Sequence, residues 1–241
     1  MNQDFEEIYL NDLLRYQECP QKRMLISELG IRSKDEAAKS VMYRHLQLMV
    51  KDCVSGEVKR HAFYSSRMYK EIEKTLGPDN VKRLSDYKTR SDRIFATMLN
   101  RYVYGKTPVM HISIPGGMTE YGLRVITTAD FSYTETRWAG VSLCLVDFTK
   151  GTYTHQFNSS LLRATVIHEH NLRNGMTVPI RIHNVIKDEY INYNSDRMHE
   201  NLARTLRMIM SRFKAGDRYY NIGSWCSYCQ CLNNCYGTII R

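Results

Sequence analysis

The sequence predicts an α/β fold, with a mixed central sheet flanked by helices, a helical region before it and a cysteine-rich tail after it. Apolar residues recur at helical intervals through the first part of the chain, and the period then shortens to two. A chain of 241 residues can bury a sizeable core, so we expect one domain. Its expected parts are a helical region at 1–106, a sheet with its helices at 107–220, and a tail at 221–241.

The helical region contains three stretches of helical spacing, at residues 10–30, 33–54 and 59–105. Pro20 interrupts the first stretch, because proline removes a backbone donor and clashes with the preceding turn. A Gly-Pro pair at 77–78 interrupts the third. We therefore expect each of these two stretches to form a pair of helices.

Three consecutive β-rich runs follow, and the turns between them contain glycine or polar residues. They predict three neighbouring, antiparallel-looking strands at residues 107–115, 122–133 and 139–148. After them the pattern predicts a helix at 158–174, strands at 178–186 and 189–194, and an amphipathic helix at 195–217.

Positive charge is concentrated in the helical region. The whole chain carries a formal charge of +9, and residues 59–106 alone contain twelve Lys or Arg against five acids. Such a segment is typical of proteins that bind a polyanion. The cations that we expect to contact nucleic acid are Lys59, Arg60, Arg67, Lys82, Arg83, Lys88, Arg90 and Arg93.

Aromatic residues lie among these cations and would suit the stacking of single-stranded bases. They are Phe63, Tyr64, Tyr69, Tyr87, Phe95, Tyr102 and Tyr104. The alternative is an ordinary amphipathic helical region, in which the aromatics face the core and the charges are solvated. The size of the charge imbalance favours nucleic acid.

No apolar run approaches the roughly 18 residues that a membrane helix needs, and the acidic start does not resemble a secretory signal. We expect a cytoplasmic protein, or one in the host cytoplasm if it is viral. Clustered cysteines in that compartment hold metal more often than they form disulfides.

Four of the seven cysteines lie in the stretch "CSYCQCLNNC" at residues 226–235. Cys226, Cys229 and Cys235 have the spacing CxxCxxxxxC, and Cys231 lies between them as an extra thiol. A closed site needs a fourth ligand, and Cys19, which precedes a proline, is the natural candidate. Four thiolates can hold either zinc or an iron–sulfur cluster. A single CxxC pair with one distant partner favours the cluster.

The remaining two cysteines, Cys53 and Cys144, lie within helical and strand patterns, where a free cysteine behaves as a small hydrophobe. The "HEH" at 168–170 invites comparison with metalloproteases. Its two histidines are two positions apart, so they do not share a helix face as that motif requires.

The order of these features resembles a known family. "LNDLLRYQECPQKRML" near the start, "ADFSY" and "LCLVDFTKG" on successive strands, and "GSWCSYCQCLNNC" near the end resemble the RecB-like iron–sulfur nucleases. These belong to the PD-(D/E)XK superfamily and include the CRISPR-associated RecB-like exonuclease and the AddB nuclease domain. The resemblance runs over most of the chain and implies a PD-(D/E)XK nuclease core.

The resemblance implies a divalent-metal site. Asp130 and Asp147 match the metal-binding aspartates of the family, His45 matches a helical histidine ligand, and the carbonyl of Phe148 would be a further ligand. Carboxylates on neighbouring strands suit Mg²⁺ or Mn²⁺, because both metals prefer oxygen ligands. Taken singly, these residues could equally cap a turn, end a strand or lie on a polar helix face.

The sequence departs from the family at two places. The catalytic lysine normally lies two residues after the second aspartate, but Thr149 stands there and Lys150 follows. Lys150 can serve only if the strand bulges or ends, because side chains alternate along a strand. The helix that follows lacks the glutamine and tyrosine of many relatives, and Gln156 is a weak substitute.

The resemblance implies a metal-dependent DNA nuclease, exonuclease or flap-type, that acts on single strands and carries a structural [4Fe–4S] cluster. Asp130, Asp147 and Lys150 would be its catalytic residues. One alternative is a catalytically degenerate module that binds DNA or a protein partner in recombination, CRISPR adaptation or transcription. Another is a zinc-stabilised nucleic-acid-binding protein unrelated to nucleases.

Overall fold

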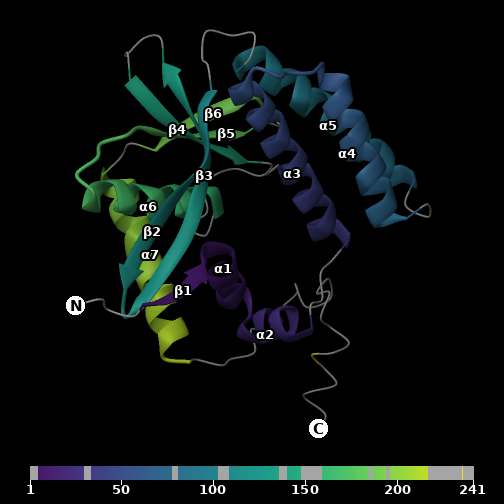
Figure 1. The fold of residues 1–241 in the computed structure, drawn as a ribbon. Coiled ribbons are helices and arrows are strands. Elements are labelled where there is room, and N and C mark those ends of the chain that lie inside the picture. The colour runs from purple at the N-terminus through teal and green to yellow at the C-terminus, as the bar shows by residue number, and fades with distance from the viewer. Residues whose placement is uncertain are drawn as a thin grey trace.

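The structure is a computed structural model, and it describes residues 5–29, 34–77, 81–102, 109–135, 140–147, 159–184, 187–193, 196–216 and Cys235. The described elements follow in the order that the sequence predicts, with one additional strand at the start (Figure 1). In chain order they are β1 (Glu6–Tyr9), α1 (Leu10–Glu18), α2 (Pro20–Leu29), α3 (Lys34–Ser55), α4 (His61–Leu76), α5 (Val81–Tyr102), β2 (Val109–Glu120), β3 (Leu123–Glu135), β4 (Gly140–Asp147), α6 (Ser159–Arg173), β5 (Ile180–Asn184), β6 (Glu189–Tyr193) and α7 (Asp196–Lys214).

The strands form one six-stranded mixed sheet in which β3 has the most neighbours. β2 pairs antiparallel along the length of β3. The opposite edge of β3 is shared, because β1 pairs parallel with its first part and β4 pairs antiparallel with its last part. β4 and β5 are parallel and are connected through α6, and β5 and β6 are antiparallel. The predicted antiparallel order of β2, β3 and β4 is confirmed.

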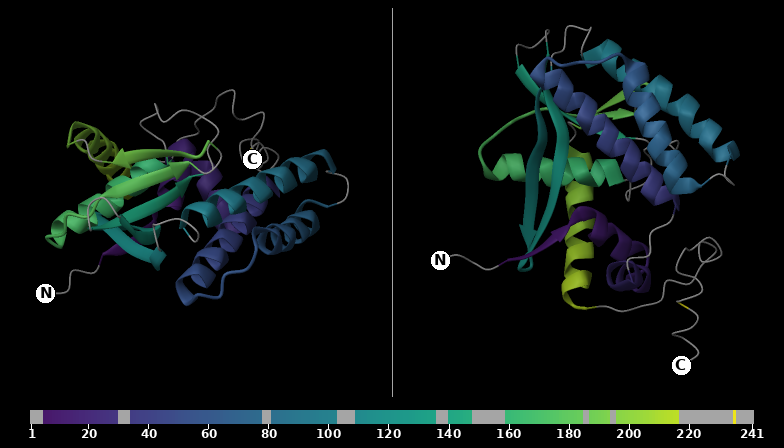
Figure 2. Two further views of the ribbon diagram at one scale, coloured as in Figure 1. Left: turned by 90° about the horizontal axis from the view of Figure 1, so that it is seen from above. Right: turned by 45° about the vertical axis from the view of Figure 1, so that its right-hand side comes forward.

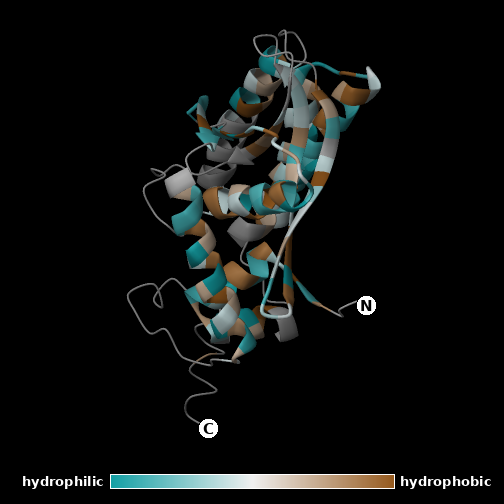
Figure 3. Ribbon diagram, turned by 90° about the vertical axis from the view of Figure 1, so that its left-hand side faces the viewer, coloured by the Kyte–Doolittle hydropathy of each residue, from teal (hydrophilic) through white to brown (hydrophobic). Residues whose placement is uncertain are grey.

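Helices cover both faces of the sheet, and successive residues of β4 show the two layers. Leu143 and Leu145 belong to a core formed with α1, α6 and α7, whereas Cys144 between them belongs to a core formed with α3, α4 and α5. The helices α3, α4 and α5 lie to one side of the strands and α7 to the other (Figure 2). Hydrophobic and hydrophilic residues alternate along the helices, as amphipathic packing requires (Figure 3).

The prediction of a mixed central sheet flanked by helices is therefore confirmed, and the helical region packs on the same sheet as α6 and α7. The division of the chain at residues 106 and 220 stays a prediction. Among the described residues, no helix is long and apolar enough to cross a membrane.

Two features of the sheet were not expected from the sequence. β1 was missed because it has four residues, of which only Ile8 is buried, so it has no period to detect. β2 was expected to end at Pro115 but continues to Glu120. Proline is tolerated there because β2 pairs with β3 alone among the described strands, and Pro115 therefore lies in an edge strand. The Pro-Gly-Gly sequence that indicated a turn is thus part of the strand.

Candidate metal and nucleic-acid site

Asp130 is a buried carboxylate on β3, next to the edge strand β2. It lies on β3 with 5% of its surface exposed, and its Oδ1 accepts a hydrogen bond of 2.9 Å from Arg163 Nη2. Arg163 comes from α6 and also donates from Nε and Nη2 to the carbonyl of Thr128, at 2.8 and 2.5 Å. These bonds hold the guanidinium against β3.

Burial lowers the pKa of Arg163, whereas the charge and the hydrogen bond of Asp130 raise it. The raising effects are larger in sum, so the pKa of Arg163 lies above its usual range. The charge of Tyr43 on α3 also contributes to that rise. The site therefore contains a permanently charged guanidinium that neutralises the predicted metal ligand.

Asp147 is the last residue of β4, and its backbone pairs in register with Asn184 of β5. Because β3 and β4 are antiparallel neighbours, the two predicted aspartates come from adjacent strands. The side chain of Asp147 lies outside the described part of the structure, as do Phe148, Thr149, Lys150 and Gln156. The convergence of the two carboxylates, and the role of Lys150, stay predictions.

His45 is buried on α3, and its Nε2 lies 2.8 Å from Glu71 Oε2 on α4. Burial, together with the charges of Arg44 and Arg67, lowers the pKa of His45, so its ring is neutral near pH 7. A carboxylate can only accept, so Nε2 carries the hydrogen and Nδ1 carries the lone pair. Glu71 is in turn ion-paired with Arg44.

The Nδ1 atom of His45 is buried and has no hydrogen-bond partner among the described residues. A neutral imidazole whose other nitrogen is held by a carboxylate is the usual form of a metal-ligating histidine. However, no three His, Cys, Asp or Glu side chains in the described ranges lie close enough together to hold a metal. A site that joins His45, Asp130 and Asp147 therefore stays a prediction.

The predicted nucleic-acid-binding residues lie on α4 and α5 or directly before α4. Lys59 and Arg60 directly precede α4, and Arg67 and Arg93 lie on α4 and α5; all four are exposed. Lys59 Nζ lies 4.6 Å from the ring centroid of Phe63, and Arg67 Cζ lies 5.7 Å from it. Four further cations have their backbone in α5 and side chains outside the described set: Lys82, Arg83, Lys88 and Arg90.

The proposal that the aromatic residues of this region stack on bases is wrong for three of them. Tyr64, Phe95 and Tyr102 are buried in the core between these helices and the sheet. Tyr64 and Phe95 stack on each other, with ring centroids 5.8 Å apart. Their helices are amphipathic, and the apolar face takes the aromatics, as the alternative interpretation had it. Tyr87 and Tyr104 lie outside the described side chains.

Cys19 lies at the junction of α1 and α2, where its N–H donates to the Arg15 carbonyl at 3.0 Å. Cys235 packs against Leu25 and Ile26 of α2, so the described part of the tail meets the helix that begins next to Cys19. Cys226, Cys229 and Cys231 lie outside the described residues.

The two cysteines expected to be structural have the properties of protonated thiols. Cys144 is fully buried and Cys53 half-buried, and burial raises their pKa values to about 12 and about 11.

Sequence reasoning missed two residues that contact the predicted ligands, Arg163 and Glu71. Glu71 gave no local signal, because it is one of many charges on α4. Arg163 did give one, since it is the single charge in the apolar run "LLRATVI". Burying a charged residue costs free energy unless the charge is paired with an opposite charge or a hydrogen-bond partner.

A polar network was also missed at the end of α5, next to the sheet. The Tyr102 hydroxyl lies 2.5 Å from that of Tyr190 and 3.2 Å from His183 Nδ1, and His183 Nε2 lies 3.0 Å from Asp188 Oδ1. Arg101 Nε donates to the same Asp188 oxygen at 2.8 Å. The network joins the helical region to β5 and β6.

No protein-family model and no curated protein sequence matches the chain. Among solved structures, the fold is similar to that of the "Putative exonuclease" from Eubacterium rectale, with a TM-score of 0.52 and 12% identity over 97% of this chain and 88% of that chain. The crystal structure of SSO0001 is similar with a TM-score of 0.43 and 9% identity, over 94% of this chain and 84% of that one. The first likeness shows a shared fold.

Proposed function

We propose that the protein is a metal-dependent deoxyribonuclease of the RecB-like type that acts on single-stranded DNA as an exonuclease or flap-type enzyme. The observation that carries the proposal is a buried aspartate, Asp130, on a strand whose antiparallel neighbour ends at a second aspartate, Asp147. The fold shared with the structure named "Putative exonuclease" supports it.

His45, Asp130 and Asp147 would hold Mg²⁺ or Mn²⁺, with the Phe148 carbonyl as a further ligand. Asp130 fits this role, because it is a buried carboxylate and both metals prefer oxygen ligands. The bare Nδ1 lone pair of His45 fits it as well. A bound divalent cation would polarise the scissile phosphate and allow water to act as nucleophile near neutral pH. Lys150 would stabilise the developing charge or orient that water.

The cysteines and the basic helices would complete the enzyme. Cys19, Cys226, Cys229 and Cys235 would hold a [4Fe–4S] cluster that ties the two ends of the chain together. The contact of Cys235 with α2 supports this arrangement. The exposed cations of α4 and α5 would guide the DNA strand by phosphate contacts.

A second candidate is a catalytically inactive module of the same fold that binds DNA or a protein partner in recombination, CRISPR adaptation or transcription. The ion pair of Arg163 with Asp130 favours it, because it neutralises a carboxylate that the metal needs. Thr149, at the position expected for a lysine, favours it too.

The test is a cleavage assay with anaerobically purified protein, end-labelled single- and double-stranded DNA, and Mn²⁺, Mg²⁺ or EDTA. Asp130→Asn and Asp147→Asn are compared with Glu200→Gln, an exposed carboxylate on α7. We expect cleavage of single strands that EDTA abolishes and that each aspartate variant reduces by about 100-fold or more, since each removes a metal ligand. Glu200→Gln should cleave like the wild type.

DNA affinity is measured on the same proteins and should stay within about twofold, because the phosphate contacts come from other residues. Cleavage by Asp147→Asn at the wild-type rate would contradict the proposal. Tight DNA binding with no cleavage under any divalent cation would establish the second candidate instead.

A further inference from the structure

We infer that Arg163 is a catalytic residue of this site, and that it binds the scissile phosphate while it shares Asp130 with the metal. The inference rests on the proposed function and adds a group that the motif comparison does not supply. It starts from the only charged residue in the apolar run of α6, which donates to a buried aspartate of β3 at 2.9 Å.

The setting of Arg163 is not what stability alone requires. Its neighbours Leu162, Ala164, Val166 and Ile167 are all buried in the core of the sheet. Replacing a buried ion pair by apolar residues of similar size is often neutral or stabilising, because desolvation offsets the attraction between the charges. An ion pair in such a place is therefore better explained by function than by fold stability.

Among the described residues, only part of the Arg163 guanidinium takes part in hydrogen bonds. The group has five N–H donors, and the Nε and Nη2 donors are directed at the Thr128 carbonyl and at Asp130. In the described part of the chain, no residue accepts from Nη1. The two bonds to the backbone of β3 fix the plane of the group, so the position of Nη1 next to Asp130 is fixed as well.

A phosphate oxygen is the acceptor that suits such a guanidinium, because its negative charge strengthens the hydrogen bond that Nη1 can donate to it. Any phosphate positioned for reaction at Asp130 lies within reach of a group that is already bonded to Asp130. Arg163 would then neutralise the charge that builds up on the phosphate oxygens as water attacks phosphorus and the bond to the leaving sugar oxygen breaks. This is the role left open by Thr149.

The same position gives Arg163 an opposite effect on metal binding. Its positive charge next to Asp130 repels a divalent cation, so the variant without it should bind the cation more tightly. A residue that merely held Asp130 in place would have the reverse effect, since its loss would weaken both metal binding and cleavage. The two roles are therefore separated by a measurement of metal affinity in the absence of DNA.

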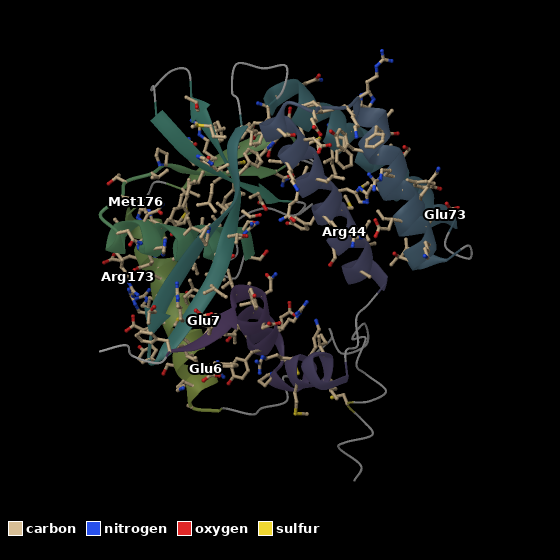
Figure 4. The ribbon with its side chains drawn as sticks, in the orientation of Figure 1. Glu6, Glu7, Arg44, Glu73, Arg173 and Met176 are labelled. Carbon is tan, nitrogen blue, oxygen red and sulfur yellow. The ribbon has the colours of Figure 1, made fainter. Side chains whose placement is uncertain are left out.

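The experiment uses the full-length, cluster-containing protein and the variants Arg163→Gln and Arg163→Lys. Arg173→Gln is the matched control, because Arg173 lies at the other end of α6 (Figure 4) and donates to the Thr119 carbonyl of β2 at 2.6 Å from an exposed position. Mn²⁺ is titrated without DNA and the free ion is followed by electron paramagnetic resonance. Single-turnover cleavage of single-stranded DNA is then measured at saturating Mn²⁺.

We expect Arg163→Gln to bind Mn²⁺ about tenfold more tightly and to cleave about 100-fold or more slowly. Arg163→Lys should keep the wild-type Mn²⁺ affinity and lose about tenfold in rate, because an ammonium lacks the planar group that bonds to β3 and presents a fixed donor to the phosphate at once. Arg173→Gln should match the wild type in both. If Arg163→Gln does not fold by circular dichroism, the rate of Arg163→Lys decides.

Cleavage by either Arg163 variant within about threefold of the wild-type rate would overturn the inference and leave the proposed nuclease function intact. Parallel loss of Mn²⁺ binding and cleavage in Arg163→Gln would overturn it as well and assign Arg163 to positioning Asp130. A wild-type protein that binds Mn²⁺ but does not cleave would refute the proposed function and the catalytic role together.

Discussion

Glu169 shows how neighbouring charges set the protonation state of a single residue. It lies on α6 with 13% of its side chain exposed, and its Oε1 is 3.2 Å from His199 Nε2 and 3.3 Å from Arg207 Nη2. The hydrogen bond from His199 lowers the pKa of Glu169 although burial opposes that change. The central residue of the "HEH" motif is therefore an ion-pair acceptor between α6 and α7.

This lowered pKa predicts a pH-dependent contribution to stability. Because the folded state binds the proton less tightly than the unfolded state, the contribution of Glu169 is present above its ordinary pKa of 4.5. It is lost as the pH falls through the lower, folded value. We expect Glu169→Gln to reduce the free energy of unfolding at pH 7 by about 1 to 2 kcal/mol.

Urea unfolding at a series of pH values measures this effect. The difference between wild type and Glu169→Gln should shrink below pH 4.5, whereas Glu200→Gln, on the exposed face of α7, should differ little from the wild type at any pH. A difference that is constant from pH 7 to pH 3 would show that the ionisation of Glu169 contributes nothing.

At the scale of elements, the contact of α6 with β2 depends on a glycine. A Cβ atom on Gly116 would lie 2.9 Å from Ile167 Cγ1 and 3.1 Å from Ile167 Cα, and the second of these is backbone. The helix therefore approaches the strand more closely than a side chain would allow. This contact helps to place α6, and with it Arg163, over β3.

We expect Gly116→Ala to destabilise the protein by about 1 to 3 kcal/mol, because α6 must move away from β2. Gly117→Ala is the control, since its Cβ would meet the end of the flexible, exposed Arg124 side chain at 3.3 Å. Thermal and urea unfolding measure both variants, and equal stabilities would contradict the proposed close packing. If the displaced helix carries Arg163 with it, cleavage by Gly116→Ala should fall as well.

Most elements could be predicted from the period of apolar residues, because each buries one stripe or one face. The helix expected at 158–174 is observed as Ser159–Arg173, and the strand expected at 139–148 as Gly140–Asp147. β1 could not be predicted, because its pairing depends on β3, more than a hundred residues away. Gly116 was expected in a turn, because the sequence does not distinguish a glycine in a turn from a glycine in a strand that a helix approaches closely.

At the scale of the whole molecule, the N-terminal helices dock on the end of α7, from which the tail departs (Figure 1). The Tyr16 hydroxyl donates to the Arg212 carbonyl at 2.9 Å, and the Tyr16 ring packs edge-on to Phe213. The guanidinium of Arg23 lies over the Phe213 ring, and its Cζ is 4.7 Å from the ring centroid. Cys19 lies between Tyr16 and Arg23, so the fold brings the predicted fourth ligand toward the start of the tail.

The candidate site could be predicted from the sequence only in part. Asp130 could be found because a strand pattern and a motif coincide at it. The partners of Arg163 and Glu71 could not, since each residue reaches its partner across a long stretch of chain, of 33 and 26 positions. Sequence spacing describes neighbours within an element, and these contacts form only when separate elements pack together.

The contact of the N-terminal helices with the end of α7 bears on the metal that the cysteines are predicted to hold. If Cys19 is a cluster ligand, Cys19→Ser should lose iron and the absorbance near about 400 nm. Its melting temperature should fall by about 4 to 8 °C, equivalent to about 2 kcal/mol, because the cluster no longer ties the tail to α2. Cys53→Ser is the control, since burial raises the pKa of that thiol to about 11 and keeps it protonated. Iron analysis and thermal unfolding of anaerobically purified protein measure both. Zinc in place of iron would contradict the cluster, and full absorbance in Cys19→Ser would contradict Cys19 as its ligand.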